Sequence, residues 1–205
     1  MMRTQTLTSW RLAALNPTNK TRALAAQHLL LAIVAGLASA VINQLGGRVL
    51  HAVWPIAASG SLVTALPRAI ILMALLVRVN RFGVLTAAGL AEVAAKVAMG
   101  GIGPMPWALT VPILGNLAGD LAWTGLGSLR SQHLRASLAG GCLCAARVLA
   151  ALLFWAVFLA ATQRGLAPVH WLFIGANMVL GATAGAIVSR ATSGKKRELK
   201  NDPSE

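Results

Sequence analysis

Charged side chains are scarce in this sequence, and their scarcity excludes a soluble domain. Only 11% of the 205 residues are Asp, Glu, Lys or Arg, whereas a typical soluble domain has about 25%. Hydrophobic residues make up 57% of the chain, and they form several runs that approach or exceed the roughly 20 residues that a helix needs to cross a bilayer. The composition therefore predicts an integral membrane protein.

The motifs of several membrane enzymes are also missing. The chain has no Walker sequence to hold nucleotide phosphates, and it has no paired histidine-and-acid sequence of a zinc protease. Residues 58–61, Ala-Ser-Gly-Ser, faintly resemble the serine motif of rhomboid proteases, but no histidine lies within a later span to act as the base. We therefore expect a protein that is not an enzyme and that has no cofactor.

The two cysteines do not indicate a metal site. Cys142 and Cys144 lie two residues apart inside an apolar run, so they point to different faces of a helix. No histidine or further cysteine stands at the spacing of metal ligands. Free cysteine is among the most buried residue types, so we predict that both residues serve in packing.

Acidic residues are few, so basic residues dominate the charge. The chain has 18 Lys and Arg against 5 Asp and Glu, a net charge of +13. The basic residues lie between and beside the apolar runs, a pattern typical of membrane topology that does not indicate nucleic acid. With six spans, the terminal segments and the connections after the second and fourth spans hold thirteen of them (four, two, two and five). The opposite connections hold only Arg48 and Arg164, so the positive-inside rule places both termini in the cytoplasm.

The apolar runs predict an all-α fold, a bundle of six transmembrane helices with both termini on the cytoplasmic side of a bacterial inner membrane. Residues 1–22 are expected to form a basic amphipathic segment on the cytoplasmic leaflet. Residues 23–189 form the transmembrane domain, and residues 190–205 form a basic, disordered cytoplasmic tail. The spans are predicted at residues 23–45, 55–77, 82–99, 107–126, 136–161 and 170–188.

The third and fourth spans contain charged residues that a bilayer should exclude. Glu92 and Lys96 stand four residues apart, so they share one face of a helix and can pair. Asn116 and Asp120 have the same spacing in the next span. An ionised side chain at this depth costs at least a few kcal/mol, so it is a candidate functional residue by default. The alternative is that Glu92 and Lys96 form a structural ion pair that ties helices together.

Four polar residues on different spans fall near the middle of the membrane, namely Glu92, Asn116, Arg147 and Asn177. They predict a ligand site below the outer connections. Asp120 lies nearer the cytoplasm, where we expect it to partner Arg68 or Arg147. Small-molecule sites combine apolar surface with a few polar anchors. The predicted ligand-binding residues are Glu92 and Asn116 at the floor, Asn177 at the wall, Trp54, Trp107 and His170 at the lid, and Lys96 above the floor.

The charge on Glu92 and the role of the tryptophans decide which ligand is expected. If Lys96 neutralises Glu92, the ligand is neutral or zwitterionic. If Glu92 is free, a cationic aromatic compound is favoured, with tryptophan in cation–π contact. An ordinary aromatic belt at the membrane interface is the alternative role for the outer tryptophans.

Small residues recur at four-residue spacing in the first span. Ala32, Gly36 and Ala40 lie on one helix face, and small residues repeated in this way leave a groove where another helix can approach closely. Because alanine is abundant throughout the chain, chance repetition is the alternative.

The whole arrangement resembles the substrate-binding S component of energy-coupling factor transporters, small six-helix membrane proteins that capture vitamins or metal ions. The similarity rests on the small-residue groove, on residues 88–92, Ala-Gly-Leu-Ala-Glu, and on residues 115–120, Gly-Asn-x-x-Gly-Asp. It is greatest to the thiamine-related branch of the family. The intramembrane Lys96 and Arg147 depart from the family's pattern.

The resemblance implies an activity and a set of partners. A vitamin-like small molecule would be captured from the outer side for ATP-driven uptake, with a coupling membrane subunit docked on Ala32, Gly36 and Ala40 and with ATPase subunits beyond it. The alternative is a stand-alone carrier, a channel or a membrane scaffold. Carriers that work alone often show internal duplication, and no convincing repeat relates the two halves of this chain, so the subunit is favoured.

Overall fold

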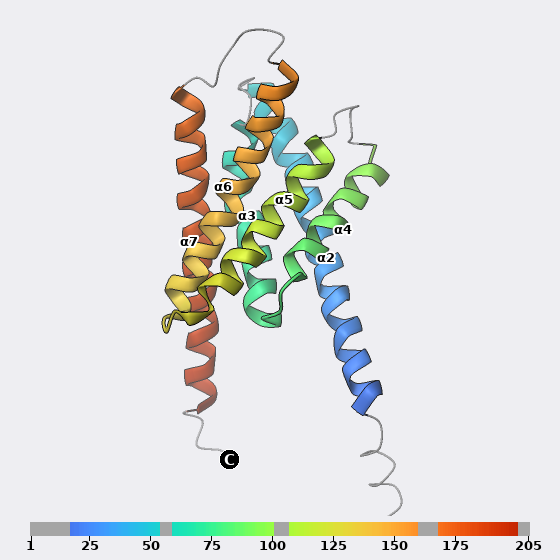
Figure 1. Cartoon of the computed structure of the whole chain (residues 1–205), viewed down its shortest axis with the longest axis vertical. Helices are drawn as coiled ribbons and strands as arrows, with labels where there is room; N and C mark the ends of the chain where they lie inside the picture. The colour runs from blue at the N-terminus through green and yellow to red at the C-terminus, as the bar shows by residue number, and fades with distance from the viewer. Residues whose placement is uncertain (1–16, 54–58, 101–106, 160–167, 201–205) are drawn as a thin grey trace, which may run out of the picture.

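The computed structural model describes residues 17–53, 59–100, 107–159 and 168–200, with side chains for residues 22–46, 62–100, 109–154 and 171–194. Within these ranges the chain forms six α-helices and one 3-10 turn (Figure 1). The elements are α2 (Pro17–Val53), α3 (Ser59–Val79), α4 (Val84–Ala98), α5 (Trp107–Gly125), η1 (Leu126–Ser128), α6 (Gln132–Leu159) and α7 (Pro168–Lys200).

The helices run up and down beside one another in a single bundle (Figure 1). The first residues of α2, the connection from α3 to α4, η1 and the last residues of α7 all lie toward one end, which we call the lower end. Helix α3 is central, because it contacts α2, α4, α6 and α7. The remaining helices form a chain of neighbours in which α2 contacts α4, α4 contacts α5, α5 contacts α6 and α6 contacts α7.

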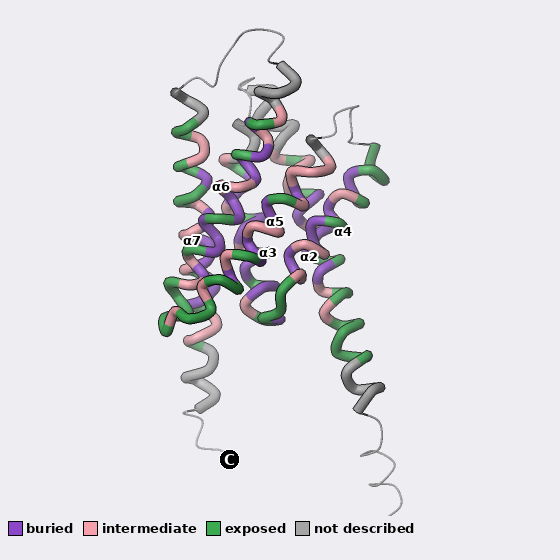
Figure 2. The backbone as a smooth tube through the Cα atoms, viewed as in Figure 1, coloured by how far each residue is buried: buried purple, intermediate pink, exposed green. Residues whose placement is uncertain are grey.

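Buried residues lie along the axis of this bundle (Figure 2). Many large apolar side chains are exposed on its outside. Leu72 and Met73 of α3 are fully buried. Leu45, Leu172 and Val179, in contrast, are 63%, 73% and 65% exposed. Large apolar side chains in such numbers on the outside are what a lipid-facing surface requires, and a soluble monomer rarely exposes patches of this kind.

Four of the helices are long and apolar enough to cross a membrane. These candidate spans are Arg22–Gly46, Leu62–Val79, Gln132–Phe154 and Trp171–Gly194. Together with the apolar exterior, they indicate a membrane-embedded, multi-pass protein. Helix α4 is shorter: its 15 residues extend about 22 Å at 1.5 Å per residue.

Several helices extend beyond the apolar runs from which they were predicted. Helix α2 begins at Pro17, and proline is favoured in the first turn because it lacks the N–H that would be unsatisfied there. Helix α7 continues to Lys200, so residues 190–200 are helical where the sequence predicts a disordered tail. The amphipathic segment predicted at the N-terminus falls mostly on residues 1–16, which lie outside the described residues.

Glycines allow a close crossing between α6 and α7. A side-chain carbon at Gly140 would meet the carbonyl oxygen of Gly181, and one at Gly185 would meet that of Ala136. Gly181 and Gly185 are spaced as in the small-x-x-x-small pattern that lets membrane helices approach closely. The spacing of these glycines is present in the sequence, but spacing alone does not show which helix lies opposite.

Candidate functional site

The candidate site is a buried network of polar side chains centred on the carboxylate of Glu92. Glu92 is 0% exposed, and its side chain is surrounded by donors from three helices. Lys96 Nζ, one turn further along α4, lies 2.9 Å from Glu92 Oε1. Arg147 Nη2 of α6 lies 2.7 Å from Oε2, and Ser39 Oγ of α2 donates to the same oxygen at 2.9 Å. The pairing of Glu92 with Lys96 that the spacing predicts is therefore present, but Lys96 is one of three donors.

Asn116 of α5 completes the network on the far side of Arg147. Arg147 Nη2 donates to Asn116 Oδ1 at 2.6 Å, and Arg147 Nε donates to the same oxygen at 3.2 Å. The amide nitrogen of Asn116 in turn donates to the carbonyl oxygen of Leu85, at 2.7 Å. Because both ends of its amide are engaged, Asn116 is held in one orientation and fixes Arg147 against Glu92.

The neighbouring residue Gly115 makes room for the stem of Arg147. A side-chain carbon at Gly115 would overlap Cγ of Arg147 and would lie 3.1 Å from its Cβ and Cδ. Two consecutive residues of α5 therefore position Arg147: Gly115 leaves space for its stem, and Asn116 binds its guanidinium.

Positive charge exceeds negative charge in this interior. One carboxylate, Glu92, faces the two cations that bond to it, Lys96 and Arg147. Arg68 of α3 is 5% exposed and interacts electrostatically with both Glu92 and Arg147. Its Nη1 donates weakly to Asn43 Oδ1 at 3.4 Å, and its Nε is buried without a hydrogen-bond partner among the described residues. Three buried cations around one carboxylate would favour an additional acceptor, because an unpaired charge is costly where water is excluded.

Asp120 has a different role from the one predicted. Its Oδ2 accepts hydrogen bonds from the backbone N–H and the hydroxyl of Thr86, at 2.8 and 2.7 Å, and its Oδ1 accepts one from Leu85 N at 3.3 Å. Helix α4 begins at Val84, so these are N–H groups of its first turn, which have no partner inside the helix and favour a negative charge. The prediction that Asp120 partners Arg68 or Arg147 was wrong: Asp120 caps α4.

The structure places the other predicted ligand residues as follows. Asn177 is buried on α7, which contacts α6 and α3, and its Nδ2 donates to Phe173 O of the same helix at 2.8 Å. Trp54 lies outside the described residues. Trp107 is the first residue of α5 and His170 lies in the first turn of α7, but their side chains fall outside the described set. The predicted lid therefore stays a prediction.

The small-residue line of the first span faces into the bundle. Ala32, Gly36 and Ala40 are all buried, and a side-chain carbon at Gly36 would meet the carbonyl oxygen of Ala88 on α4. The close approach that the spacing predicts thus occurs within the chain. Docking of a partner on this line stays a prediction, and it would require α2 and α4 to separate.

Two residues of the network were missing from the predicted ligand set. Arg147 was placed at the same membrane depth as Glu92 and Asn116, and that shared depth was the signal for its inclusion. Ser39 carries a hydroxyl within an apolar run, which is itself a sign that an acceptor lies opposite.

Lys96 is the most exposed of the three charged residues that form the ion pairs. The side chains of Glu92 and Arg147 are 0% and 3% exposed, whereas that of Lys96 is 10% exposed. Lys96 is near the end of α4 that lies away from the lower end (Figure 1).

Within the described part of the chain, no three His, Cys, Asp or Glu side chains come together as a metal-binding group. Comparisons with protein families, with curated proteins and with solved structures found no match to this chain.

Proposed function

We propose that this protein is the substrate-binding membrane subunit of an energy-coupling factor importer, which captures a vitamin-like small molecule from outside the cell. The observation that carries the proposal is the buried polar network on α2, α4, α5 and α6, in which Glu92 is bonded by Lys96, Arg147 and Ser39. Charged side chains at membrane depth are costly and mark binding or transport sites by default. The coupling membrane subunit and ATPase subunits are the proposed partners.

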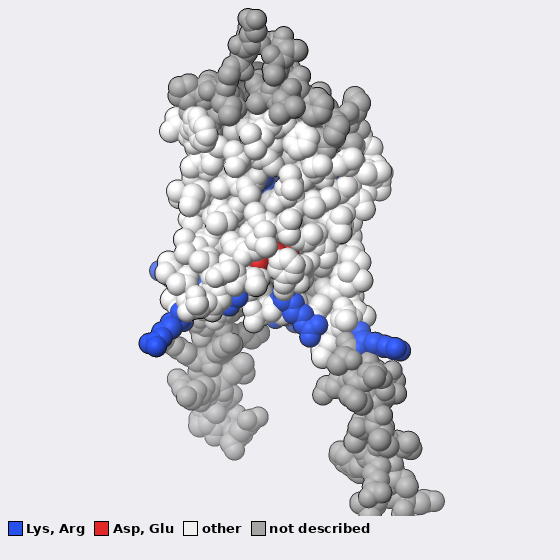
Figure 3. All heavy atoms as spheres, viewed as in Figure 1, with Lys and Arg blue, Asp and Glu red and all other residues white. Residues whose placement is uncertain are grey.

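The proposed topology has six spans with both termini in the cytoplasm of a bacterial inner membrane. One support is that the first residues of α2 and the last residues of α7 lie at the same end, the lower end (Figure 1). The other is that most basic side chains of the described residues gather at this end on the face seen in Figure 3. Exposed arginines occur there at the helix ends and connections, namely Arg22, Arg78, Arg81, Arg130 and Arg190. By the positive-inside rule this end is cytoplasmic.

A neutral or zwitterionic ligand fits the charges of the network better than a cationic one. Both Lys96 and Arg147 bond to Glu92, so its carboxylate is already neutralised. A cation placed beside them would add to an excess of positive charge in a low-dielectric interior, which is unfavourable. The carboxylate of a zwitterion would instead be attracted by the positive charge of Lys96 and Arg147.

The test is ligand binding to the purified protein and to a charge-neutral variant. A thermal-stability screen with neutral and cationic vitamins, riboflavin and thiamine among them, identifies the ligand, and calorimetric titration gives its affinity. Glu92→Gln keeps the shape of the side chain and releases its cations, so we expect a loss of at least about tenfold in affinity, about 1.4 kcal/mol. Asp120→Asn is the matched control, because Asp120 caps α4 and does not bond to the network.

A second candidate, a membrane scaffold without a ligand, is favoured by one observation. Glu92 is fully buried and is bonded by three donors, which is also how a structural ion cluster would be built. If no compound stabilises the wild-type protein, and if Glu92→Gln only lowers its stability, the scaffold replaces the importer subunit.

A further inference from the structure

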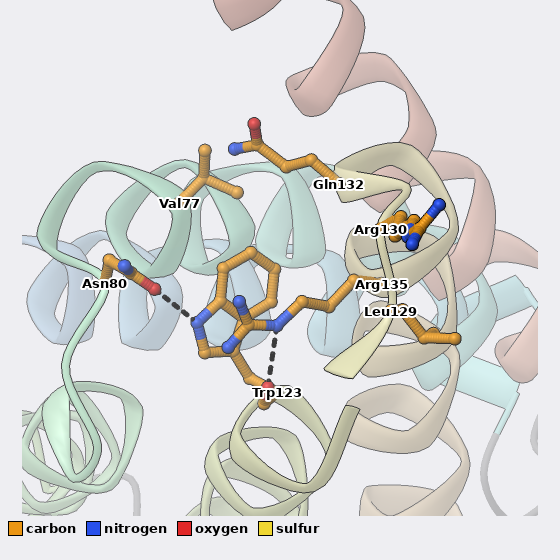
Figure 4. Close-up of a pocket in the computed structure, with 7 residues that line it drawn as sticks. All are labelled: Val77, Asn80, Trp123, Leu129, Arg130, Gln132 and Arg135. Carbon is orange, nitrogen blue, oxygen red and sulfur yellow. Dashed lines mark hydrogen bonds between the residues drawn. The ribbon is translucent and has the colours of Figure 1, made fainter. Parts of the chain in front are cut away.

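A hollow at the lower end of the bundle is independent of the Glu92 network. It has a volume of about 320 Å³, at the small end of the range of about 300–1,000 Å³ for ligand pockets. It lies where the last turn of α3, the end of α5 and the start of α6 meet (Figure 4). Its lining residues are Val77, Asn80, Trp123, Leu129, Arg130, Gln132 and Arg135.

Trp123 and Arg135 form the fixed part of this pocket. Trp123 is 3% exposed, and its indole N–H donates to Asn80 Oδ1 at 2.9 Å. Asn80 has a positive φ of 49° at the turn into α4, a conformation that asparagine tolerates better than most residues. The guanidinium of Arg135 lies over the indole ring, 4.0 Å from its centroid, and Arg135 Nε donates to Trp123 O at 2.8 Å (Figure 4). The arginine is therefore positioned before any ligand arrives.

Several side-chain N–H groups that line the pocket make no hydrogen bond with the described residues. Arg135 Nε donates to Trp123 O, but the two terminal nitrogens of Arg135 make no hydrogen bond with the described residues. The same holds for the side chains of Arg130 and Gln132 and for the amide nitrogen of Asn80. None of the lining residues is acidic, and the nearest acid along α5, Asp120, is engaged by the first turn of α4.

We propose that this pocket binds the phosphate of an anionic phospholipid headgroup. Arginine presents paired N–H groups that match phosphate oxygens, and hydrogen bonds between such charged groups are the strong ones. The pocket lies at the end of a membrane-embedded bundle where basic side chains gather (Figure 3), which is the level of the headgroups. Val77 and Leu129 supply the apolar wall that a glycerol backbone and the start of an acyl chain would contact.

Lipid binding is measured on the full-length protein in a neutral detergent, titrated with phosphatidylglycerol or phosphatidylcholine and observed by native mass spectrometry. We expect one phosphatidylglycerol to bind in clear preference to phosphatidylcholine. The double variant Arg130→Gln/Arg135→Gln should weaken phosphatidylglycerol binding by about tenfold or more, because each basic residue near a membrane surface contributes appreciably to the attraction of anionic lipid.

The matched control is Arg22→Gln/Arg190→Gln, which removes the same charge from two exposed arginines that do not line the pocket. It should leave the affinity unchanged. An equal loss in both double variants would mean diffuse attraction and would overturn the site, as would equal binding of the two lipids.

Two further experiments complete the test. The first distinguishes a loss of binding from a loss of folding, and the second distinguishes a bound lipid from a bound soluble phosphate. Arg130→Gln alone leaves the contacts between Arg135 and Trp123 intact, so it should weaken binding without lowering the melting temperature. Failure to weaken binding would overturn the role of Arg130 in the pocket. Inorganic phosphate or glycerol 3-phosphate at millimolar concentration should not displace the lipid; displacement would overturn the lipid as the occupant in favour of a soluble phosphate.

Discussion

Two arginines of helix α6, one in the interior and one at the lower end, differ in the partners that hold their positive charge. Arg147, in the interior, is 2% exposed and bonds to a carboxylate and an amide on two other helices. Arg135, twelve residues earlier at the lower end, is half-buried and is held by a backbone carbonyl and an aromatic ring.

The comparison shows what each environment demands of a cation. Within a bundle, where the dielectric constant is low, an arginine needs a counter-charge and a full set of acceptors. At the interface, neutral acceptors are enough because water supplies the remaining hydrogen bonds. The guanidinium of Arg147 is therefore fully engaged by the protein, whereas the terminal nitrogens of Arg135 are available to a ligand.

The largest effect is expected from breaking the interior network. Arg147→Met keeps the length of the stem and removes the guanidinium, which leaves Glu92 with Lys96 and Ser39 and leaves Asn116 Oδ1 without its donor. Removing one partner of a buried ion pair costs about 3–5 kcal/mol, and we expect a loss of that size in the free energy of unfolding, measured by SDS titration in mixed micelles.

Arg190→Met is the control for Arg147→Met, because Arg190 is exposed on α7. Its substitution should change the free energy of unfolding by less than about 0.5 kcal/mol, as surface substitutions usually do. A loss of similar size in the two variants would remove the distinction between interior and surface arginines.

An intermediate effect is expected from filling the space that Gly115 leaves for Arg147. In Gly115→Ala the new methyl group meets the Arg147 stem close to its backbone, where it cannot easily move aside. Overpacking of this kind costs about 1–3 kcal/mol. In an Arg147→Ala background the same substitution should cost much less, because the stem is gone, and this coupling can be measured with a double-mutant cycle.

Gly125→Ala is the matched control on the same helix. Gly125 has helical backbone angles, and a side-chain carbon there would meet none of the described residues within 4 Å, so alanine should be neutral or should stabilise the helix by up to about 1 kcal/mol. Destabilisation by both alanines would point to a general intolerance of α5 and not to the fit around Arg147.

The sequence allowed the membrane class and part of the network to be predicted. Glu92 and Lys96 could be paired because residues four apart on a helix are neighbours, and the pair is present. The shared depth of Glu92, Asn116 and Arg147 could be counted along the spans, and these three residues do meet.

What could not be predicted depends on how the helices turn toward one another. Asp120 lies one turn below Asn116, but its carboxylate caps α4 because the first turn of that helix lies against α5. The packing of Ala32, Gly36 and Ala40 against the inside of the bundle could not be predicted for the same reason. Spacing identifies a face of a helix, but it does not identify the neighbour that covers this face. The pocket beside Trp123 joins α3, α5 and α6, and no local pattern indicates it.

The smallest effect is expected at the lower end. Arg135→Gln removes the cation over the Trp123 ring, a contact worth about 0.5–1 kcal/mol at an exposed site, so the free energy of unfolding should fall by about this amount. Arg135→Lys keeps the charge but loses the planar fork and should fall between the wild type and Arg135→Gln. Arg130→Gln, which does not touch the ring, should leave stability unchanged. A loss at Arg135 as large as that of Arg147→Met would mean that the protein holds the interface arginine as firmly as the interior one, and its terminal nitrogens would then not be available to bind a phosphate.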